Sequence, residues 1–232
     1  MYNNSTWRFF VGILDFLFPK RCVGCGRVGS YFCESCRAKI RYVAVNESIC
    51  PMCERPAIDG VTHPGCRTRY GLDGLTSFFR YDGPVRKAVK VLKYRLVSDV
   101  SAEFVGLVPA SSLNDVPKAD CSIPIPLHPT RLRSRGFNQA EVLGKSVAAR
   151  LNIPVRTDIL RRVKITTPQV SMKTRDARLG NMKNVFRAVK TIQNGDIILF
   201  DDVFTTGATM RSAANTLKRK GAKRVWAVTM AR

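Results

Sequence analysis

Long hydrophobic runs are missing from this sequence. The longest apolar stretch spans residues 7–18 and is interrupted by Arg8, Gly12 and Asp15, so it falls short of the roughly 18 apolar residues that a membrane-spanning helix requires. The N-terminus also lacks a basic segment ahead of a clean apolar run, and it lacks a small-residue cleavage site. We therefore expect no transmembrane segment, no secretory signal and a cytoplasmic location.

Acidic residues are also scarce. The 232 residues include 17 Asp and Glu against 39 Lys and Arg, which gives a formal net charge of +22 at pH 7. Hydrophobic residues make up 45% of the chain, which is enough for a packed core. Wholesale disorder is therefore excluded, and the length predicts one or two domains.

Cysteine is nearly absent from the second half of the chain. Seven of the eight cysteines precede residue 67, and only Cys121 follows, where it is expected to be a small core residue. Residues 71–232 also hold 29 basic and 12 acidic side chains. These shifts predict an N-terminal apolar helix over residues 1–21, a cysteine-rich module over 22–70 and a larger domain over 71–232. The apolar helix is expected to pack against one of the two other parts, with a partner or membrane surface as the alternative.

The cysteine-rich module has the spacing of a double zinc ribbon. Each pair of ligands is separated by two residues, a gap that lets both side chains of a tight turn reach one tetrahedral ion. Four such pairs supply eight ligands, enough for two structural Zn²⁺ ions. The expected ligands are Cys22, Cys25, Cys33, Cys36, Cys50, Cys53, His63 and Cys66.

Alternatives remain open within this module. Disulfides would use the same cysteines, although a chain in a reducing compartment favours metal. His63 is the weakest ligand, because the segment Thr62-His63-Pro64 is equally typical of a surface loop. The spacing allows either sequential pairing, with one all-cysteine site and one mixed site, or an interleaved arrangement.

The second half alternates predicted strands and helices. Strands are expected over residues 75–81, 122–126, 196–204 and 224–230, and helices over 138–151 and 208–220. A further helix has an apolar stripe that runs from Val85 to Leu96. This alternation predicts an α/β fold with a parallel sheet covered on both faces, in which ligands bind at the carboxyl ends of the strands.

One strand ends in chemistry that is typical of phosphoribosyl binding. Four apolar residues precede Asp201 and Asp202, and a loop of Thr205, Thr206, Gly207, Ala208 and Thr209 then opens a helix. Backbone N–H groups, threonine hydroxyls and a helix N-terminus form an anion cradle, while the two carboxylates can accept hydrogen bonds from ribose hydroxyls. A strand end with an ordinary helix cap is the simpler alternative, but a cap needs only one acid. The segment closely resembles the PRPP-binding motif of type I phosphoribosyltransferases.

A second motif is rich in arginine. After His128, three arginines fall at alternate positions, Arg131, Arg133 and Arg135, followed by Gly-Phe-Asn-Gln. Clustered guanidinium groups suit phosphate oxygens, so we expect a loop over residues 127–135 that faces a diphosphate leaving group. A solvated basic loop is the alternative.

Taken together, the four knuckle pairs, the acid-pair motif and the PLHP-x-R-x-R-x-RGFNQ stretch resemble the ComF/GntX competence family. That family is described as a double zinc ribbon joined to a phosphoribosyltransferase domain and is linked to DNA uptake and natural transformation. The resemblance covers nearly the full chain. It departs at His63, where family members more often have cysteine.

The resemblance implies roles for several residues. Asp201 and Asp202 would be the catalytic acids that bind ribose hydroxyls and Mg²⁺ with PRPP, and residues 205–209 would hold the 5-phosphate. Residues 164–184 would form a hood over the substrate, in which Gln169, Arg175 and Arg178 are the candidate contacts. The implied reaction is displacement of diphosphate from PRPP by a nitrogen nucleophile. A metabolic phosphoribosyltransferase acting on an unidentified base or amine, and a non-catalytic DNA-binding module that responds to nucleotides, are the alternatives.

The basic second half also suggests a nucleic-acid surface. Arg86, Lys87, Lys90 and Lys93 lie along one predicted helix, and the sequence pI of about 10.3 is that of a basic domain. Single-stranded DNA is the expected nucleic-acid partner, and DNA-uptake or recombination proteins are further candidates.

Overall fold

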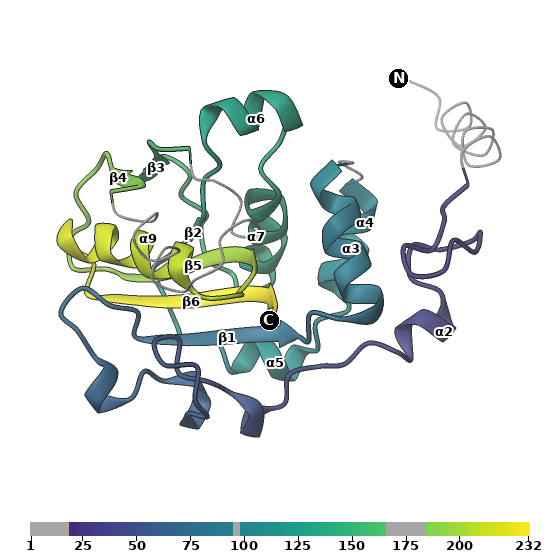
Figure 1. Cartoon of the computed structure of the whole chain (residues 1–232), viewed down its shortest axis with the longest axis horizontal. Coiled ribbons are helices and arrows are strands. Elements are labelled where there is room, and N and C mark those ends of the chain that lie inside the picture. The colour runs from purple at the N-terminus through teal and green to yellow at the C-terminus, as the bar shows by residue number, and fades with distance from the viewer. Residues whose placement is uncertain (1–18, 95–97, 166–183) are drawn as a thin grey trace, which may run out of the picture.

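The computed structural model describes residues 19–94, 98–165 and 184–232 (Figure 1). Residues 1–18 of the expected N-terminal helix therefore lie outside the described residues. The same holds for Leu96 and for the candidate hood contacts Gln169, Arg175 and Arg178.

A parallel sheet forms the centre of the larger domain. In the described residues its strands are β1 (Gly74–Phe79), β2 (Cys121–Pro124), β5 (Asp196–Val203) and β6 (Arg224–Ala231), and their spatial order is β1-β6-β5-β2. Every neighbouring pair is parallel. The two central strands are rich in apolar residues because both of their faces are covered. The α/β class with a parallel sheet is thus confirmed.

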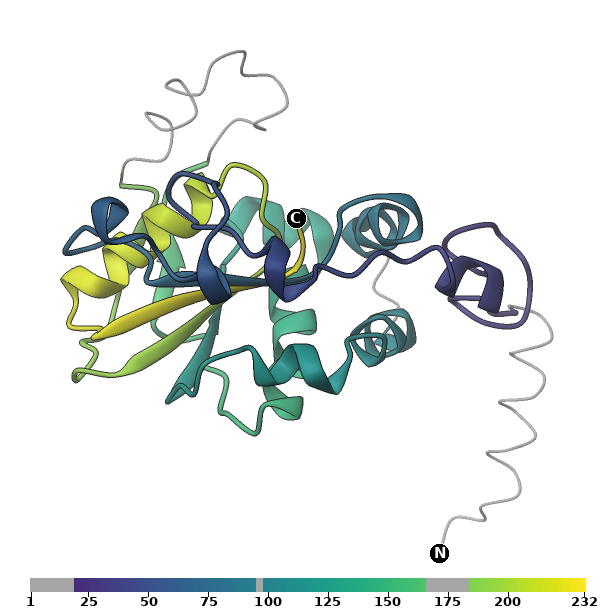
Figure 2. The same cartoon turned by 90° about the horizontal axis from the view of Figure 1, so that it is seen from below.

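Helices cover the two faces of this sheet (Figures 1 and 2). Ile197 and Leu199 of β5 pack in one core cluster with α9 (Ala208–Arg219), whereas Ile198 and Phe200 pack in a second cluster with α7 (Gln139–Arg150). This alternation follows from the period of two along a strand. Around these helices lie α3 (Gly83–Tyr94), α4 (Ser98–Gly106) and the short α5 (Ala110–Asn114).

A small antiparallel pair, β3 (Leu160–Arg162) and β4 (Phe186–Ala188), stands apart from the main sheet. Its two strands flank the segment that was expected to form the hood.

The segment over residues 127–135, expected to be a loop, is instead the helix α6 (Pro129–Arg135). Pro129 at the start of a helix needs no N–H partner, and His128 caps the helix by accepting a hydrogen bond from the N–H of Thr130 at 3.3 Å. Gly136, with φ of 78°, ends it in the left-handed conformation that glycine favours. Proline at the start and glycine at the end are local signals that would have predicted this helix.

The cysteine-rich module contains α2 (Glu34–Arg37) and the short 3₁₀ turns η1 (Val45–Glu47), η2 (Ile58–Gly60) and η3 (Pro64–Cys66). It covers the outer edge of β1, where the Val43 N–H donates to the carbonyl of Phe78 at 3.0 Å and the Thr62 N–H donates to that of Asp73 at 2.9 Å. Figure 2 shows the module along this edge. An edge strand is thereby protected from pairing with other chains.

An aromatic stack fastens the first part of the module to the larger domain. The Phe32 and Phe104 rings are 5.7 Å apart, and Phe104 lies 5.4 Å from Phe79. Beside them, Arg37 pairs with Glu103 at 2.7 Å. The first part of the module therefore docks on α4 and on the carboxyl end of β1. Within the part of the chain that the structure describes, no helix is long and apolar enough to span a bilayer.

Candidate functional site

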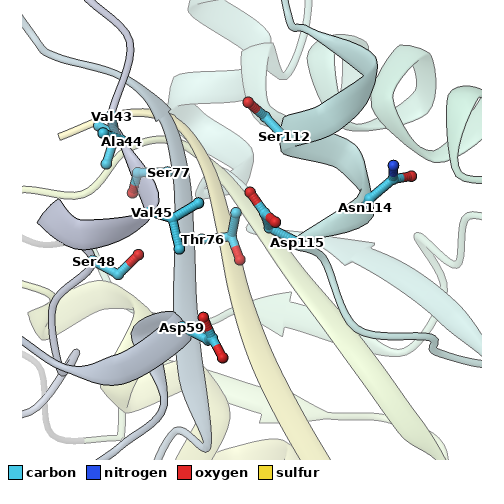
Figure 3. Close-up of a pocket in the computed structure, with 10 residues that line it drawn as sticks. All are labelled: Val43, Ala44, Val45, Ser48, Asp59, Thr76, Ser77, Ser112, Asn114 and Asp115. Carbon is cyan, nitrogen blue, oxygen red and sulfur yellow. The ribbon is translucent and has the colours of Figure 1, made fainter.

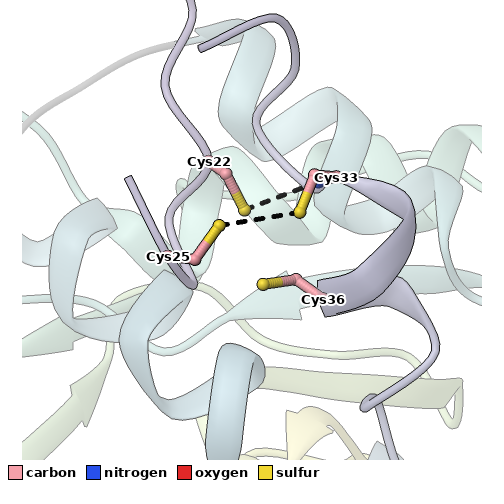
Figure 4. Close-up of side chains that lie close together, drawn as sticks. All are labelled: Cys22, Cys25, Cys33 and Cys36. Atoms are coloured by element: carbon pink, nitrogen blue, oxygen red, sulfur yellow. Dashed lines mark hydrogen bonds between the residues drawn. The ribbon is translucent and has the colours of Figure 1, made fainter. Parts of the chain in front are cut away.

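The first metal-ligand cluster consists of Cys22, Cys25, Cys33 and Cys36, whose sulfur atoms all lie within 4.8 Å of one another. Figure 4 shows the four side chains converging from two segments. The Sγ atoms of Cys25 and Cys33 are 3.6 Å apart, close to the edge of about 3.8 Å that four Zn–S bonds of about 2.3 Å give a tetrahedron. Gly24 is needed here, because a Cβ at that position would lie 2.6 Å from Cys36 Sγ.

The protonation chemistry of this cluster also fits a divalent cation. Burial raises the pKa of the Cys22 thiol, but the N–H groups of Cys33, Cys25 and Gly24 outweigh it, and the pKa falls to about 6. For Cys36, burial and the neighbouring thiols raise the pKa to about 12. Four sulfurs this close cannot all be thiolates without a cation between them. Zn²⁺ supplies that charge and accepts four sulfur ligands.

The second cluster consists of Cys50, Cys53, His63 and Cys66, again with all ligand atoms within 4.8 Å. His63 Nδ1 lies 3.3 Å from Cys53 Sγ. Nε2 of His63 lies 2.9 Å from the carbonyl oxygen of Pro56, which can only accept, so Nε2 carries the proton. Metal-binding histidines usually direct their second nitrogen to such an acceptor. The Nδ1 lone pair is thus left to face the cysteines.

The two clusters answer the pairing question left open by the spacing. Each contains ligand pairs that are consecutive in the sequence, so the pairing is sequential and not interleaved. Cys121 lies outside both clusters and packs against the core around α9.

The acid pair lies at the carboxyl end of β5. The Asp202 N–H donates to Oδ1 of Asp201 at 2.9 Å, and the Val203 N–H donates to Oδ1 of Asp202 at 2.9 Å. Asp201 keeps part of its surface exposed, but protein atoms surround its carboxyl group closely. Burial raises the pKa of Asp201 well above its usual range, and the neighbouring Asp202 carboxylate raises it further. A cation or hydroxyl donors would stabilise the ionised pair.

Two cationic side chains from distant segments face this pair. Lys93 Nζ, at the end of α3, lies 3.4 Å from Oδ2 of Asp202. Arg162, on β3, interacts electrostatically with both Asp201 and Arg131, and burial lowers the pKa of its guanidinium. Its guanidinium also lies 5.5 Å from the centre of the Phe186 ring. The acids are therefore placed among positive charges suited to phosphate groups.

The predicted phosphate loop runs from the acid pair into α9. Gly207, with φ of 66°, occupies the position before the first residue of the helix, so the N–H groups of the first turn face the loop. A Cβ at Gly207 would lie 2.5 Å from Cζ of Phe204. The loop therefore needs glycine both for its backbone angle and for space.

The three arginines of α6 do not share one environment. Residues four apart lie on one side of a helix, so Arg131 and Arg135 share a face and Arg133 points elsewhere. Arg131 and Arg135 are partly buried, whereas Arg133 is exposed. Arg131 lies close enough to Arg162 to lower the pKa of its guanidinium, and Arg162 in turn interacts with Asp201.

The candidate nucleic-acid residues on α3 also differ in their surroundings. Arg86 and Lys90 are exposed, whereas Lys87 Nζ donates to the carbonyl of Gly24 at 2.6 Å. Lys93, as described above, pairs with Asp202. The structure therefore brings Lys93 to the acid pair, and Arg86 and Lys90 stay available to solvent.

A cavity of about 300 Å³ lies elsewhere, between the cysteine-rich module, β1 and α5 (Figure 3). Asp59, Thr76 and Asp115 are among the 10 lining residues drawn. None of those 10 is Lys or Arg, and none belongs to the acid pair or its loop. It is therefore unsuited to a phosphate group.

Sequence reasoning missed the placement of Lys93, Arg162 and Arg211. Lys93 is expected on a nucleic-acid surface, Arg162 is one of the 29 basic residues of the second half, and Arg211 belongs to no predicted motif. Their positions depend on crossovers that return to one edge of a parallel sheet, for which the local sequence carries no signal.

The chain therefore combines two zinc-ribbon clusters with a parallel α/β domain that carries an acid pair and an anion loop. These features define a double zinc ribbon protein with a phosphoribosyltransferase-type domain. Comparison with known families agrees, since the double zinc ribbon domain matches residues 13–67 and the phosphoribosyl transferase domain matches residues 138–232.

Relatives match most of the chain. It is 30% identical to the DNA utilization protein YhgH of Salmonella typhi over 201 aligned residues. The aligned part covers 82% of this chain and 86% of the relative. It is 30% identical over 206 residues to competence protein ComFC of Bacillus subtilis, covering 82% and 78% of the two chains. Competence protein F of Haemophilus influenzae is 27% identical over 219 aligned residues, which make up 90% of this chain and 90% of the relative. The chain belongs to the ComF competence family, as its motifs predicted.

Proposed function

We propose that this protein binds PRPP at the carboxyl end of β5. The observation that carries the proposal is the Asp201–Asp202 pair, which is followed directly by the Gly207 turn and the N-terminus of α9. In this proposal the first-turn N–H groups and threonine hydroxyls bind the 5-phosphate, and the two carboxylates accept hydrogen bonds from the ribose hydroxyls.

The surrounding cations would bind the other end of the substrate. Arg162 is close enough to Asp201 to interact with it, and Arg131 is close enough to Arg162 to do the same. Both can donate to diphosphate oxygens, and guanidinium groups do so with two parallel hydrogen bonds. Mg²⁺ bound with PRPP at Asp201 and Asp202 would neutralise charge on the diphosphate.

The reaction that such a site would support is displacement at the anomeric carbon of the ribose. The bond from this carbon to diphosphate breaks, a bond to a nitrogen nucleophile forms, and the nitrogen loses a proton to solvent. Residues 205–209 would contribute by holding the 5-phosphate, which fixes the reacting carbon in line with its leaving group. The arginines would take up the charge that develops on the diphosphate.

We further propose that the protein acts in DNA uptake and contacts single-stranded DNA. The names of the relatives concern competence and DNA utilization. The exposed Arg86 and Lys90 on α3 offer a surface for backbone phosphates. DNA-uptake or recombination proteins are the partners that this role would require.

The PRPP proposal is tested by calorimetric titration of the zinc-loaded full chain with PRPP and Mg²⁺. Saturable binding is expected, and it should be lost in a variant that carries both Asp201→Asn and Asp202→Asn. Asp59→Asn, which changes an exposed carboxylate away from β5, is the matched control and should bind normally. A folded wild-type protein that does not bind PRPP would refute the proposal.

The DNA proposal has its own test, because the two surfaces differ. Arg86→Ser with Lys90→Ser should weaken binding of single-stranded DNA and lower the slope of log affinity against log salt by about 1.4, at about 0.7 per phosphate contact. Binding of PRPP should not change. Lys118→Ser with Lys223→Ser removes the same charge from other exposed positions and serves as control. Equal losses in both double variants would show that net charge alone, and not this face of α3, attracts DNA.

A further inference from the structure

The side chain of Arg211 joins the cysteine-rich module to the predicted phosphate loop. Arg211 lies in the first turn of α9, and its Nη1 donates to the carbonyl of Pro51 at 2.7 Å and approaches that of Met52 at 3.4 Å. Its Nη2 donates to the carbonyl of Thr206. One guanidinium therefore connects backbone segments that are separated by more than 150 residues of sequence.

The carbonyls on the two sides of this guanidinium belong to functional segments. Pro51 and Met52 are the two residues between Cys50 and Cys53, so their backbone forms the turn that holds two ligands of the second metal cluster. Thr206 lies within the 205–209 loop. A displacement of the metal-binding turn would therefore pull on the loop through two hydrogen bonds.

The packing around Gly207 makes this connection specific. A Cβ at Gly207 would lie 3.0 Å from Nη1 of Arg211, besides its clash with Phe204. The guanidinium thus lies directly against the turn that opens α9. A planar group with donors on two nitrogens can satisfy carbonyls on both sides, whereas a lysine ammonium has one donor atom.

The first metal cluster has no equivalent connection among the contacts described here. Its turn between Cys22 and Cys25 is held by Lys87 of α3, which donates to the carbonyl of Gly24, and the rest docks through Arg37 and Phe32 on Glu103 and Phe104 of α4. Neither helix contains any of residues 205–209. The two clusters therefore offer a comparison within one chain.

We propose that Arg211 is a positioning residue that couples the second zinc cluster to the phosphate loop. Zinc in the Cys50–Cys66 cluster orders residues 205–209 through Arg211, and a phosphate ligand on that loop in turn stabilises zinc, because coupling between two sites is reciprocal. The consequence for PRPP rests on the proposed function, whereas the connection itself does not.

NMR order parameters of the backbone amides of residues 205–209 in the zinc-loaded full chain test the connection without PRPP. In Arg211→Met they should fall from about 0.85, the value typical of a rigid backbone, to below about 0.6. Arg219→Met, which changes an arginine two turns further along α9, should leave them unchanged. His63→Ala should act like Arg211→Met, whereas Cys25→Ser in the first cluster should not. Unchanged order parameters in Arg211→Met would overturn the proposal.

Chelator-driven zinc release tests the coupling to ligand. In the wild-type chain, PRPP with Mg²⁺ should slow the release of one of the two zinc ions, and in Arg211→Met this protection should disappear. Equal protection in both proteins would overturn the coupling. A wild-type chain that does not bind PRPP would refute the proposed function, while the order parameters of the loop would still decide whether Arg211 holds it.

Discussion

Lys93 places its Nζ atom 3.4 Å from Oδ2 of Asp202 and so connects the end of α3 to the acid pair. The two side chains are partly buried, with exposures of 32% and 15%, so solvent screens this pair less than it screens a surface salt bridge. The ammonium also lowers the pKa of Asp201, which burial and Asp202 raise. Lys93 thereby favours the charged form that a ribose-binding site needs.

Replacing Lys93 should therefore change how PRPP binding depends on pH. Without the ammonium, the pKa of Asp201 rises further, and a protonated Asp201 no longer presents a full carboxylate to the ligand. For Lys93→Met, the midpoint at which PRPP affinity falls should move to higher pH, as measured by titration across a pH series. Lys90→Met, one turn earlier on the exposed side of α3, is the control and should keep the wild-type midpoint.

Ionisation of Asp201 should destabilise the unliganded protein at neutral pH. Its pKa in the folded chain is above the unfolded value of about 3.9. The folded state therefore binds this proton more tightly, so the stability is fully present below the unfolded pKa and is lost as the pH rises through the folded pKa. Each unit of difference in pKa corresponds to about 1.4 kcal/mol.

Asp201→Asn, which cannot ionise, should then raise the thermal midpoint of the unliganded chain at about pH 7, by about 2–4 °C for each kcal/mol recovered. Near pH 4, where Asp201 is protonated in the fold, the variant and the wild type should melt together. Asp59→Asn, which changes an exposed carboxylate away from β5, is the control and should leave the thermal midpoint unchanged at both pH values. A gain of the same size at both pH values would argue against ionisation as the cause.

The two histidines of the chain offer a direct test of the second metal cluster. Elemental analysis should find two zinc ions per wild-type chain and about one in His63→Ala, whereas His63→Cys should restore the second because it supplies a fourth thiolate. His128→Ala removes only a helix cap and should retain both ions. Two zinc ions in purified His63→Ala would remove His63 from the ligand set.

The two sides of α6 should differ in their effect on PRPP. Arg131→Gln removes the partly buried guanidinium near Arg162 and should weaken PRPP binding by about 10-fold or more, the scale of a lost hydrogen bond to a charged group. Arg133→Gln, which removes an exposed guanidinium from the same helix, should change affinity by less than about threefold. Similar effects of both variants would indicate only general attraction by positive charge.

The sequence predicted those features that are encoded within a few residues. Within each motif the residues are only a few positions apart. This holds for each ligand pair of the knuckles, and for the acid pair with the glycine before α9, so the local spacing is enough to predict the chemistry. The helix α6 was also encoded locally, by Pro129 and Gly136, although a loop was expected there.

Contacts between distant segments could not be predicted in this way. Lys93 reaches Asp202 only because β1 and α3 return to the edge where β5 ends, and Arg211 reaches Pro51 only because the cysteine-rich module lies along β1. In a parallel sheet, strands that are neighbours in space are joined by long crossovers, so local spacing does not show which side chains meet.

A crystal structure of the zinc-loaded chain with PRPP and Mg²⁺ would test the central claim most directly. The account predicts the 5-phosphate at the N–H groups of residues 205–209, the ribose hydroxyls on Asp201 and Asp202, and the diphosphate on the side of Arg131 and Arg162. PRPP bound at another place, or an empty β5 end at a PRPP concentration that saturates the protein in solution, would contradict it.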